Sequence, residues 1–134
     1  MTAVGDELPT LELRVTRADL VRYAGASGDF NPIHWSDRIA TGVGLPGVIA
    51  HGMFTMALVG RAVTTWAGAP DAVVEFSVRF SRPVEVPDTD EGTEVVVSAV
   101  IKDVTADGHT RLNLTATCNG DKVLSMAQAV IRKR

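Results

Sequence analysis

The second half of the chain alternates between apolar and polar residues with the period of two that is typical of β-strands. Residues 74–80 and 112–118 follow this alternation, and residues 95–104 form a run rich in β-branched side chains. Residues 123–131 provide a further apolar stretch of strand length. We therefore predict a β-rich second half whose last three strands follow one another directly.

Two short dipeptides, Asp107-Gly108 and Asn119-Gly120, separate these last three strands. Both are sequences that type I′ hairpin turns prefer, because the two central residues of such a turn need positive φ angles. Three strands joined by two tight turns predict an antiparallel meander.

The first half predicts one short strand followed by a capped helix. Residues 11–15 alternate like a strand. Thr16, with Asp19 three residues later, has the pattern of a capping box that opens a helix. Gly25 and Gly28 are the residues at which we expect this helix to end.

The middle of the chain predicts two more helices. Ser36 and Asp37 can cap a short one, and residues 53–66 form a longer one. The longer helix is apolar nearly all round apart from Arg61 and several threonines, so we expect it to be buried. Gly60 inside it costs about 1 kcal/mol relative to alanine, so we expect close packing or substrate room there.

A long buried helix ahead of an antiparallel meander predicts an α+β fold. A curved sheet wrapped around one central helix is the economical arrangement, and this is the hotdog architecture. We expect residues 1–134 to form one such domain. An isolated sheet of this kind has open edges, which a second subunit would cover.

Composition and charge narrow the classes of function. Hydrophobic residues make up 46% and charged residues 22% of the chain, an ordinary globular balance. A net charge of −3 without a basic block in the body of the chain argues against nucleic-acid binding. We expect no membrane span, no signal peptide and a cytoplasmic location. The single cysteine, Cys118, excludes an internal disulfide and a cysteine zinc cluster.

The strongest chemical signal is the pair Asp29 and His34. The turn that carries them is broken by Gly28 and Pro32, so both side chains can point into one cleft. A carboxylate beside an imidazole is an acid–base pair that works near neutral pH. Asn31 adds an amide that can fix Asp29 or the loop backbone.

A second signal is Gly52, at the start of the long helix. Backbone N–H groups there are unpaired and lie at the positive end of the helix dipole, so they can form an oxyanion hole. We expect His51 to shape the helix start and Ser27 to hydrogen-bond within its loop. Asp29, His34 and His51 match no compact metal-binding spacing, so we expect no metal ion.

Residues 23–34 (YAGASGDFNPIH), followed by the element His51-Gly52-Met53, resemble the hydratase-2 signature of the MaoC-like family. That family comprises (R)-specific enoyl-CoA hydratases and (3R)-hydroxyacyl thioester dehydratases. Segments 27–35 and 49–56 are most similar to the catalytic subunits of actinobacterial (3R)-hydroxyacyl-ACP dehydratases.

The resemblance implies removal of water from (3R)-hydroxyacyl thioesters carried by acyl carrier protein, without a cofactor. It implies that Asp29 and His34 are the catalytic dyad, that the Gly52 N–H binds the thioester oxygen, and that Asn31 supports them. An (R)-specific enoyl-CoA hydratase is the nearest alternative; a hotdog thioesterase and a scaffold subunit are weaker ones. It also implies a partner, either a second copy or a sister hotdog subunit.

Overall fold

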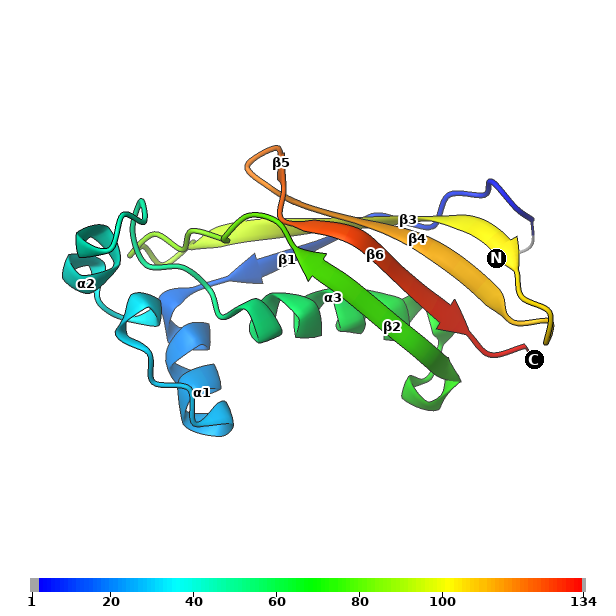
Figure 1. Ribbon diagram of the computed structural model, residues 1–134, viewed down its shortest axis with the longest axis horizontal. Coiled ribbons are helices and arrows are strands. Elements are labelled where there is room, and N and C mark those ends of the chain that lie inside the picture. Colours follow the sequence, from blue (N-terminus) through cyan, green and yellow to red (C-terminus); the bar gives the residue numbers. More distant parts are fainter. Residues whose placement is uncertain (1–2, 134) are drawn as a thin grey trace.

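The computed structural model describes residues 3–133, and Figure 1 shows an antiparallel sheet with the helices gathered on one side of it. The elements in chain order are β1 (Leu11–Val15), α1 (Arg17–Ser27), the 3-10 helix η1 (Pro32–His34), α2 (Asp37–Gly42), α3 (Gly52–Ala67), the 3-10 helix η2 (Pro70–Ala72), β2 (Val73–Phe80), β3 (Thr93–Val104), β4 (Thr110–Cys118), β5 (Asp121–Lys122) and β6 (Leu124–Ile131).

The strands form one sheet in the order β1-β3-β4-β6-β2, and the short β5 pairs with β4. The pairs β3–β4 and β4–β6 are antiparallel, so β3, β4 and β6 form the predicted meander. β2 pairs with the other side of β6. Within residues 3–133, β1 and β2 are therefore the two edge strands.

The long helix α3 lies along one face of this sheet (Figure 1). Its inward side contributes Leu58, Val59, Ala62 and Val63 to a core that continues into the sheet. This arrangement confirms the predicted α+β hotdog architecture. The expectation that the helix is buried nearly all round is wrong, because its outer side is open and Met53 is 58% exposed.

The two predicted tight turns differ in conformation. Asn119 and Gly120 both have positive φ angles, of 52° and 83°, as a type I′ turn requires. At the other turn only Gly108 has a positive φ, so Asp107-Gly108 does not form a type I′ turn. Its wider loop closes instead through a hydrogen bond from the Thr105 N–H to the His109 carbonyl.

The helix caps follow from the sequence with one correction. Thr16 and Asp19 form the capping box of α1, and the Ser36 side chain caps α2. α1 runs through Gly25 and ends at Gly28, whose φ of 76° is the left-handed conformation that glycine adopts readily. Among the described residues, no helix combines the length and apolar character needed to cross a membrane.

Candidate active site

A chain of short-range hydrogen bonds shapes the loop after α1. The Ser27 hydroxyl accepts from the Asp29 N–H at 3.1 Å. The Asp29 carboxylate accepts from the Asn31 N–H at 3.1 Å, and the Asn31 side-chain oxygen accepts from the Ile33 N–H at 3.2 Å. Such side-chain-to-backbone bonds stabilise turns at the expense of regular helix. Ser27 and Asn31 therefore set the path of the loop on which Asp29 lies.

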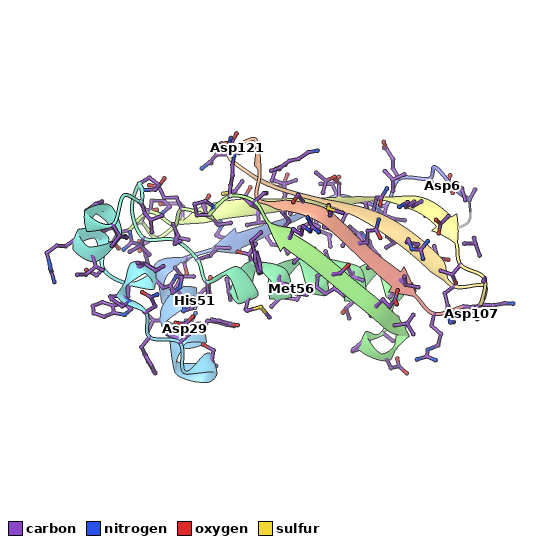
Figure 2. The ribbon with its side chains drawn as sticks, viewed as in Figure 1. Asp6, Asp29, His51, Met56, Asp107 and Asp121 are labelled. Atoms are coloured by element: carbon purple, nitrogen blue, oxygen red, sulfur yellow. The ribbon has the colours of Figure 1, made fainter. Side chains whose placement is uncertain are left out.

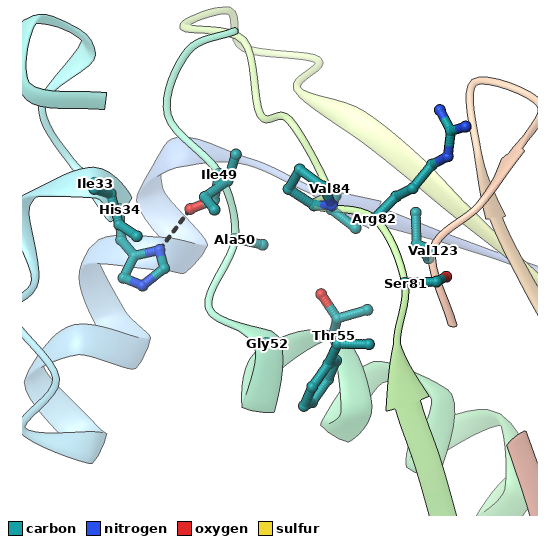
Figure 3. Close-up of a pocket in the computed structure, with 12 residues that line it drawn as sticks. Ile33, His34, Ile49, Ala50, Gly52, Thr55, Ser81, Arg82, Val84 and Val123 are labelled. Carbon is teal, nitrogen blue, oxygen red and sulfur yellow. Dashed lines mark hydrogen bonds between the residues drawn. The ribbon is translucent and has the colours of Figure 1, made fainter. Parts of the chain in front are cut away.

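His34 lies at the end of this loop with its side chain buried. Its Nδ1 is 2.7 Å from the carbonyl oxygen of Ile49 (Figure 3). A carbonyl can only accept a hydrogen bond, so in the neutral ring the proton is on Nδ1 and the lone pair is on Nε2. That Nε2 lies 4.0 Å from a carboxylate oxygen of Asp29.

The Ile49 carbonyl is held in position because hydrogen bonds fix the segment that carries it. The Ile49 N–H donates to the Ile33 carbonyl at 3.2 Å. The neighbouring Val48 N–H donates to the Asp37 carboxylate at 3.0 Å, and Arg17 pairs with the same carboxylate at 2.9 Å. The Val48 bond and the Arg17 guanidinium hold the pKa of Asp37 below its usual 3.8.

His51 is 1% exposed and contacts both Asp29 and His34. Its ring stacks on His34 with centroids 3.8 Å apart and planes 21° apart. Its Nε2 is 3.1 Å from the backbone carbonyl oxygen of Asp29. His51 is the N-cap residue of α3, at the helix start where it was expected, although its side chain makes no cap hydrogen bond.

The protonation state of His51 follows from its surroundings. Burial lowers the pKa of His51 below its usual 6.5, and the neighbouring His34 acts in the same direction. The hydrogen bond to the Asp29 carbonyl and the Asp29 charge oppose this shift. Burial dominates, so the ring is neutral at neutral pH.

A cavity of about 420 Å³ opens beside His34 and Gly52 (Figure 3). Gly52 is the first residue of α3, so its N–H has no partner within the helix and lies at the positive end of the helix dipole. The remaining wall is mostly apolar and is formed by Ile33, Ile49, Ala50, Thr55, Phe80, Ser81, Arg82, Pro83, Val84 and Val123. Asp29 lies outside this lining, on the exposed loop beyond His34.

Phe80, at the end of β2, closes this cavity over Gly52. A Cβ atom placed on Gly52 would lie 3.3 Å from the Phe80 ring. Glycine therefore allows the aromatic ring to pack closely against the start of α3. No sequence motif indicates Phe80 or the Ile49 carbonyl as a part of the site.

A second, larger hollow of about 720 Å³ follows the open side of α3 and the edge strand β2. Met53 and Met56, which sequence alone could assign to a core or to an acyl tunnel, line this hollow. Gly60 lies beside Phe76, whose ring would be 3.3 Å from an added Cβ. Gly60 also lines the hollow, so both expected reasons for glycine, close packing and room for a substrate, stay open.

Asp29, His34 and His51 bring one ligand atom each within 4.8 Å of one another, a spacing that can suggest a metal site. The stacking of the two imidazoles argues against that interpretation. Lone pairs of imidazole lie in the ring plane, so two stacked rings direct them side by side instead of toward one ion. The cluster fits proton transfer better than metal binding.

Comparison with known proteins gives these residues a family context. A family model described as MaoC like domain matches residues 1–118. A 3-hydroxyacyl-thioester dehydratase X of Mycobacterium tuberculosis is 49% identical over 81 residues, which is 60% of this chain and 28% of that protein. A 3-hydroxybutyryl-CoA dehydratase of Methylorubrum extorquens is 31% identical over 124 residues, covering 91% of this chain and 75% of that protein.

A solved structure described as a MaoC-like dehydratase superposes with a TM-score of 0.95 at 41% identity. It covers 99% of this chain, whereas this chain covers 41% of that one. The expected family and hotdog fold are confirmed, and the relatives are named for the predicted class of reaction. The chain nevertheless spans less than half the length of two of these three proteins.

Proposed function

Because the chain belongs to the MaoC-like family, we propose that it is a hydro-lyase that converts (3R)-hydroxyacyl thioesters to trans-2-enoyl thioesters. The observation that carries this proposal is the approach of the His34 Nε2 to the Asp29 carboxylate at 4.0 Å, beside a cavity that Gly52 also lines. The cavity thus offers a base and an oxyanion donor, and a second proton carrier, Asp29, lies on the loop beside it.

In the proposed reaction the thioester carbonyl oxygen accepts a hydrogen bond from the Gly52 N–H. His34 takes the α-proton at its Nε2, which has a free lone pair because Nδ1 donates to Ile49. The electron pair of the broken C–H bond delocalises onto the thioester oxygen, where the Gly52 N–H stabilises the charge.

Water then leaves as the C–O bond at the β-carbon breaks and the double bond forms. With the help of Asp29, the departing hydroxyl receives the proton that His34 took from the α-carbon, so that water leaves and both residues return to their starting protonation states. Both groups lie on the same side of the substrate, so the elimination is syn. Hydration is the same sequence in reverse.

The carrier of the acyl chain is proposed to be acyl carrier protein, with CoA as the alternative and the cytoplasm as the place of reaction. One relative is named for a CoA ester, and another for a hydroxyacyl thioester, a name that specifies no carrier. The two carriers are separated by measuring kcat/KM for the same acyl chain on each carrier. A higher value on CoA would make the protein an (R)-specific enoyl-CoA hydratase.

The open side of α3 supports a partner subunit. Met53 is 58% exposed, and the hollow beside it is bounded by the edge strand β2. Apolar surface beside an unpaired edge strand is the kind of surface that subunits cover. We propose that residues 1–134 act as one hotdog unit that pairs with a second copy or a sister subunit.

The proposed reaction is tested by adding the purified protein to a crotonyl thioester and following the loss of the enoyl absorbance. We expect hydration by the wild type and none above background by His34→Ala. Release of free thiol without prior hydration would instead indicate a thioesterase. Equal rates for wild type and His34→Ala would overturn the proposed dyad.

A further inference from the structure

His51 is the residue that joins the two halves of the dyad. Its ring stacks on His34 at 3.8 Å, and its Nε2 lies 3.1 Å from the carbonyl oxygen of Asp29. Figure 2 places the labelled Asp29 and His51 close together near the start of α3. No other part of the proposed mechanism uses this buried imidazole.

We propose that His51 is a positioning residue that sets the distance between Asp29 and His34. Its Nε2–H holds the backbone of Asp29, and its ring forms a platform for the imidazole of His34. This inference rests on the proposed function, because that function gives Asp29 and His34 their roles. His51 itself lies outside the cavity lining and acts through its two neighbours.

The hydrogen-bonding surroundings of His51 require a neutral ring. A proton on Nε2 is needed to donate to the Asp29 carbonyl, so the lone pair of the neutral ring lies on Nδ1. That Nδ1 is buried and has no hydrogen-bond partner among the described residues. A second proton placed there would be buried without an acceptor, which is unfavourable.

The stacking of His51 on His34 also favours a neutral His51 ring. During the reaction His34 receives the α-proton and becomes an imidazolium, 3.8 Å from the His51 ring. A neutral aromatic ring attracts a cation on its face, whereas a second imidazolium would repel it. A neutral His51 therefore favours the charged form that His34 reaches in the transition state.

A role limited to packing is a poorer account of these contacts. Tyr23 also packs on His51, with ring centroids 4.8 Å apart. Filling this space needs an apolar ring only, and a phenylalanine would do so without burying an unpartnered nitrogen. The Nε2–H contact to Asp29 is the one interaction for which histidine is required.

Two substitutions separate the two contacts. His51→Phe keeps a ring beneath His34 and removes the N–H donor, whereas His51→Gln keeps an amide N–H and removes the ring. We expect each to lower kcat by about 10- to 100-fold with KM changed less than about threefold, since small misplacements of reacting groups cost rates of this order. The assay is crotonyl thioester hydration, with thermal unfolding measured in parallel.

His109→Gln is the matched control, because this histidine lies beside the turn of Asp107, which Figure 2 places at the opposite end of the molecule. We expect wild-type kcat from it. NMR of the imidazole nitrogens in the wild type is the second measurement, and we expect the proton of His51 on Nε2 at neutral pH. This NMR measurement uses the wild type only, so it tests the proposal even if one variant fails to fold.

The inference is overturned if either folded His51 variant keeps the wild-type kcat, or if NMR finds the proton on Nδ1. The proposed function fails separately, through absence of hydration by the wild type or full activity of His34→Ala. An active wild type, an inactive His34→Ala and unchanged His51 variants would therefore reject only the positioning role.

Discussion

The Nε2 of His34 and the nearer carboxylate oxygen of Asp29 are 4.0 Å apart, although the first side chain is buried and the second is half exposed. This distance is too long for a direct hydrogen bond but suits a bridging hydroxyl or water. The pair thus combines an imidazole that is buried in the protein with a carboxylate that is partly exposed to solvent.

Removing either member of the pair should abolish most activity while leaving the fold intact. For Asp29→Asn and His34→Ala we expect kcat to fall by about 10²- to 10⁴-fold, the usual contribution of general acid–base catalysis. Asp88→Asn changes an exposed carboxylate elsewhere and should have wild-type kinetics. Unchanged far-UV circular dichroism would show that lost activity is not unfolding; wild-type turnover by either dyad variant would contradict the assignment.

The Gly52 N–H can be removed without disrupting α3. Proline is favourable at the first position of a helix, and the backbone of His51, with φ −58° and ψ 135°, suits a residue before proline. We expect Gly52→Pro to lower kcat by about 10²- to 10³-fold, as loss of an oxyanion donor does.

Gly52→Ala is the control for this substitution. Its Cβ meets the Phe80 ring at 3.3 Å, as the proline Cβ would, but it keeps the N–H. Phe80 is 53% exposed and can move aside. We expect the alanine variant to stay within a few-fold of wild type; equal losses in both would show that the N–H is not the relevant group.

Burial of His51 should make stability fall in mild acid. Below about pH 6.5 the unfolded chain protonates His51 while the folded chain, in which its pKa is lowered, does not. The free energy of unfolding should therefore decrease as the pH falls below 6.5 toward the lowered pKa, with no such change above it.

Urea unfolding at about pH 7.5, 6.5 and 5.5 measures this dependence in wild type, His51→Phe and His109→Gln. Asp29, His34 and Tyr23 face His51 and remain in all three proteins. We expect a shallower pH dependence in His51→Phe alone. Parallel curves for wild type and His51→Phe would refute this explanation.

Thr16 should contribute measurably to stability through the α1 capping box. Its hydroxyl accepts from the Asp19 N–H, and its own N–H donates to the Asp19 carboxylate at 2.9 Å. We expect Thr16→Ala to lower the free energy of unfolding by about 1 kcal/mol. Thr65→Ala removes an exposed hydroxyl within α3 and should change it by less than about 0.5 kcal/mol. Equal effects in denaturant unfolding would contradict a specific capping role.

Most of the fold could be predicted because its signals are local. Alternation along residues 112–118, the Thr16–Asp19 box and the Asn119-Gly120 turn each specify nearby backbone. The errors concern choices between local alternatives. Two glycines could end α1, and only contacts made by the rest of the fold decide that Gly28 does so. The open side of α3 was missed because an apolar helix face packs equally well on a sheet or on another subunit.

In the site, too, the contacts between residues close in sequence could be predicted, and the contacts that depend on the rest of the fold could not. Asp29 and His34 could be expected to meet because only four residues, in a turn, separate them. The Ile49 carbonyl that orients His34 is a backbone group, so no side chain indicates it. The contact of His51 with both members of the dyad depends on how α3 approaches the loop, which sequence spacing does not specify.

The cavity is assembled from two parts of the chain with separate tasks. His34 and Gly52 line it from the stretch that also carries Asp29, while residues 80–84 and Val123 supply the facing wall. Mutations in that wall can therefore alter which acyl chains fit while the proton-handling groups stay unchanged. Substitutions confined to these wall positions can therefore change substrate preference during evolution. A directed-evolution library restricted to the same positions would have the same effect.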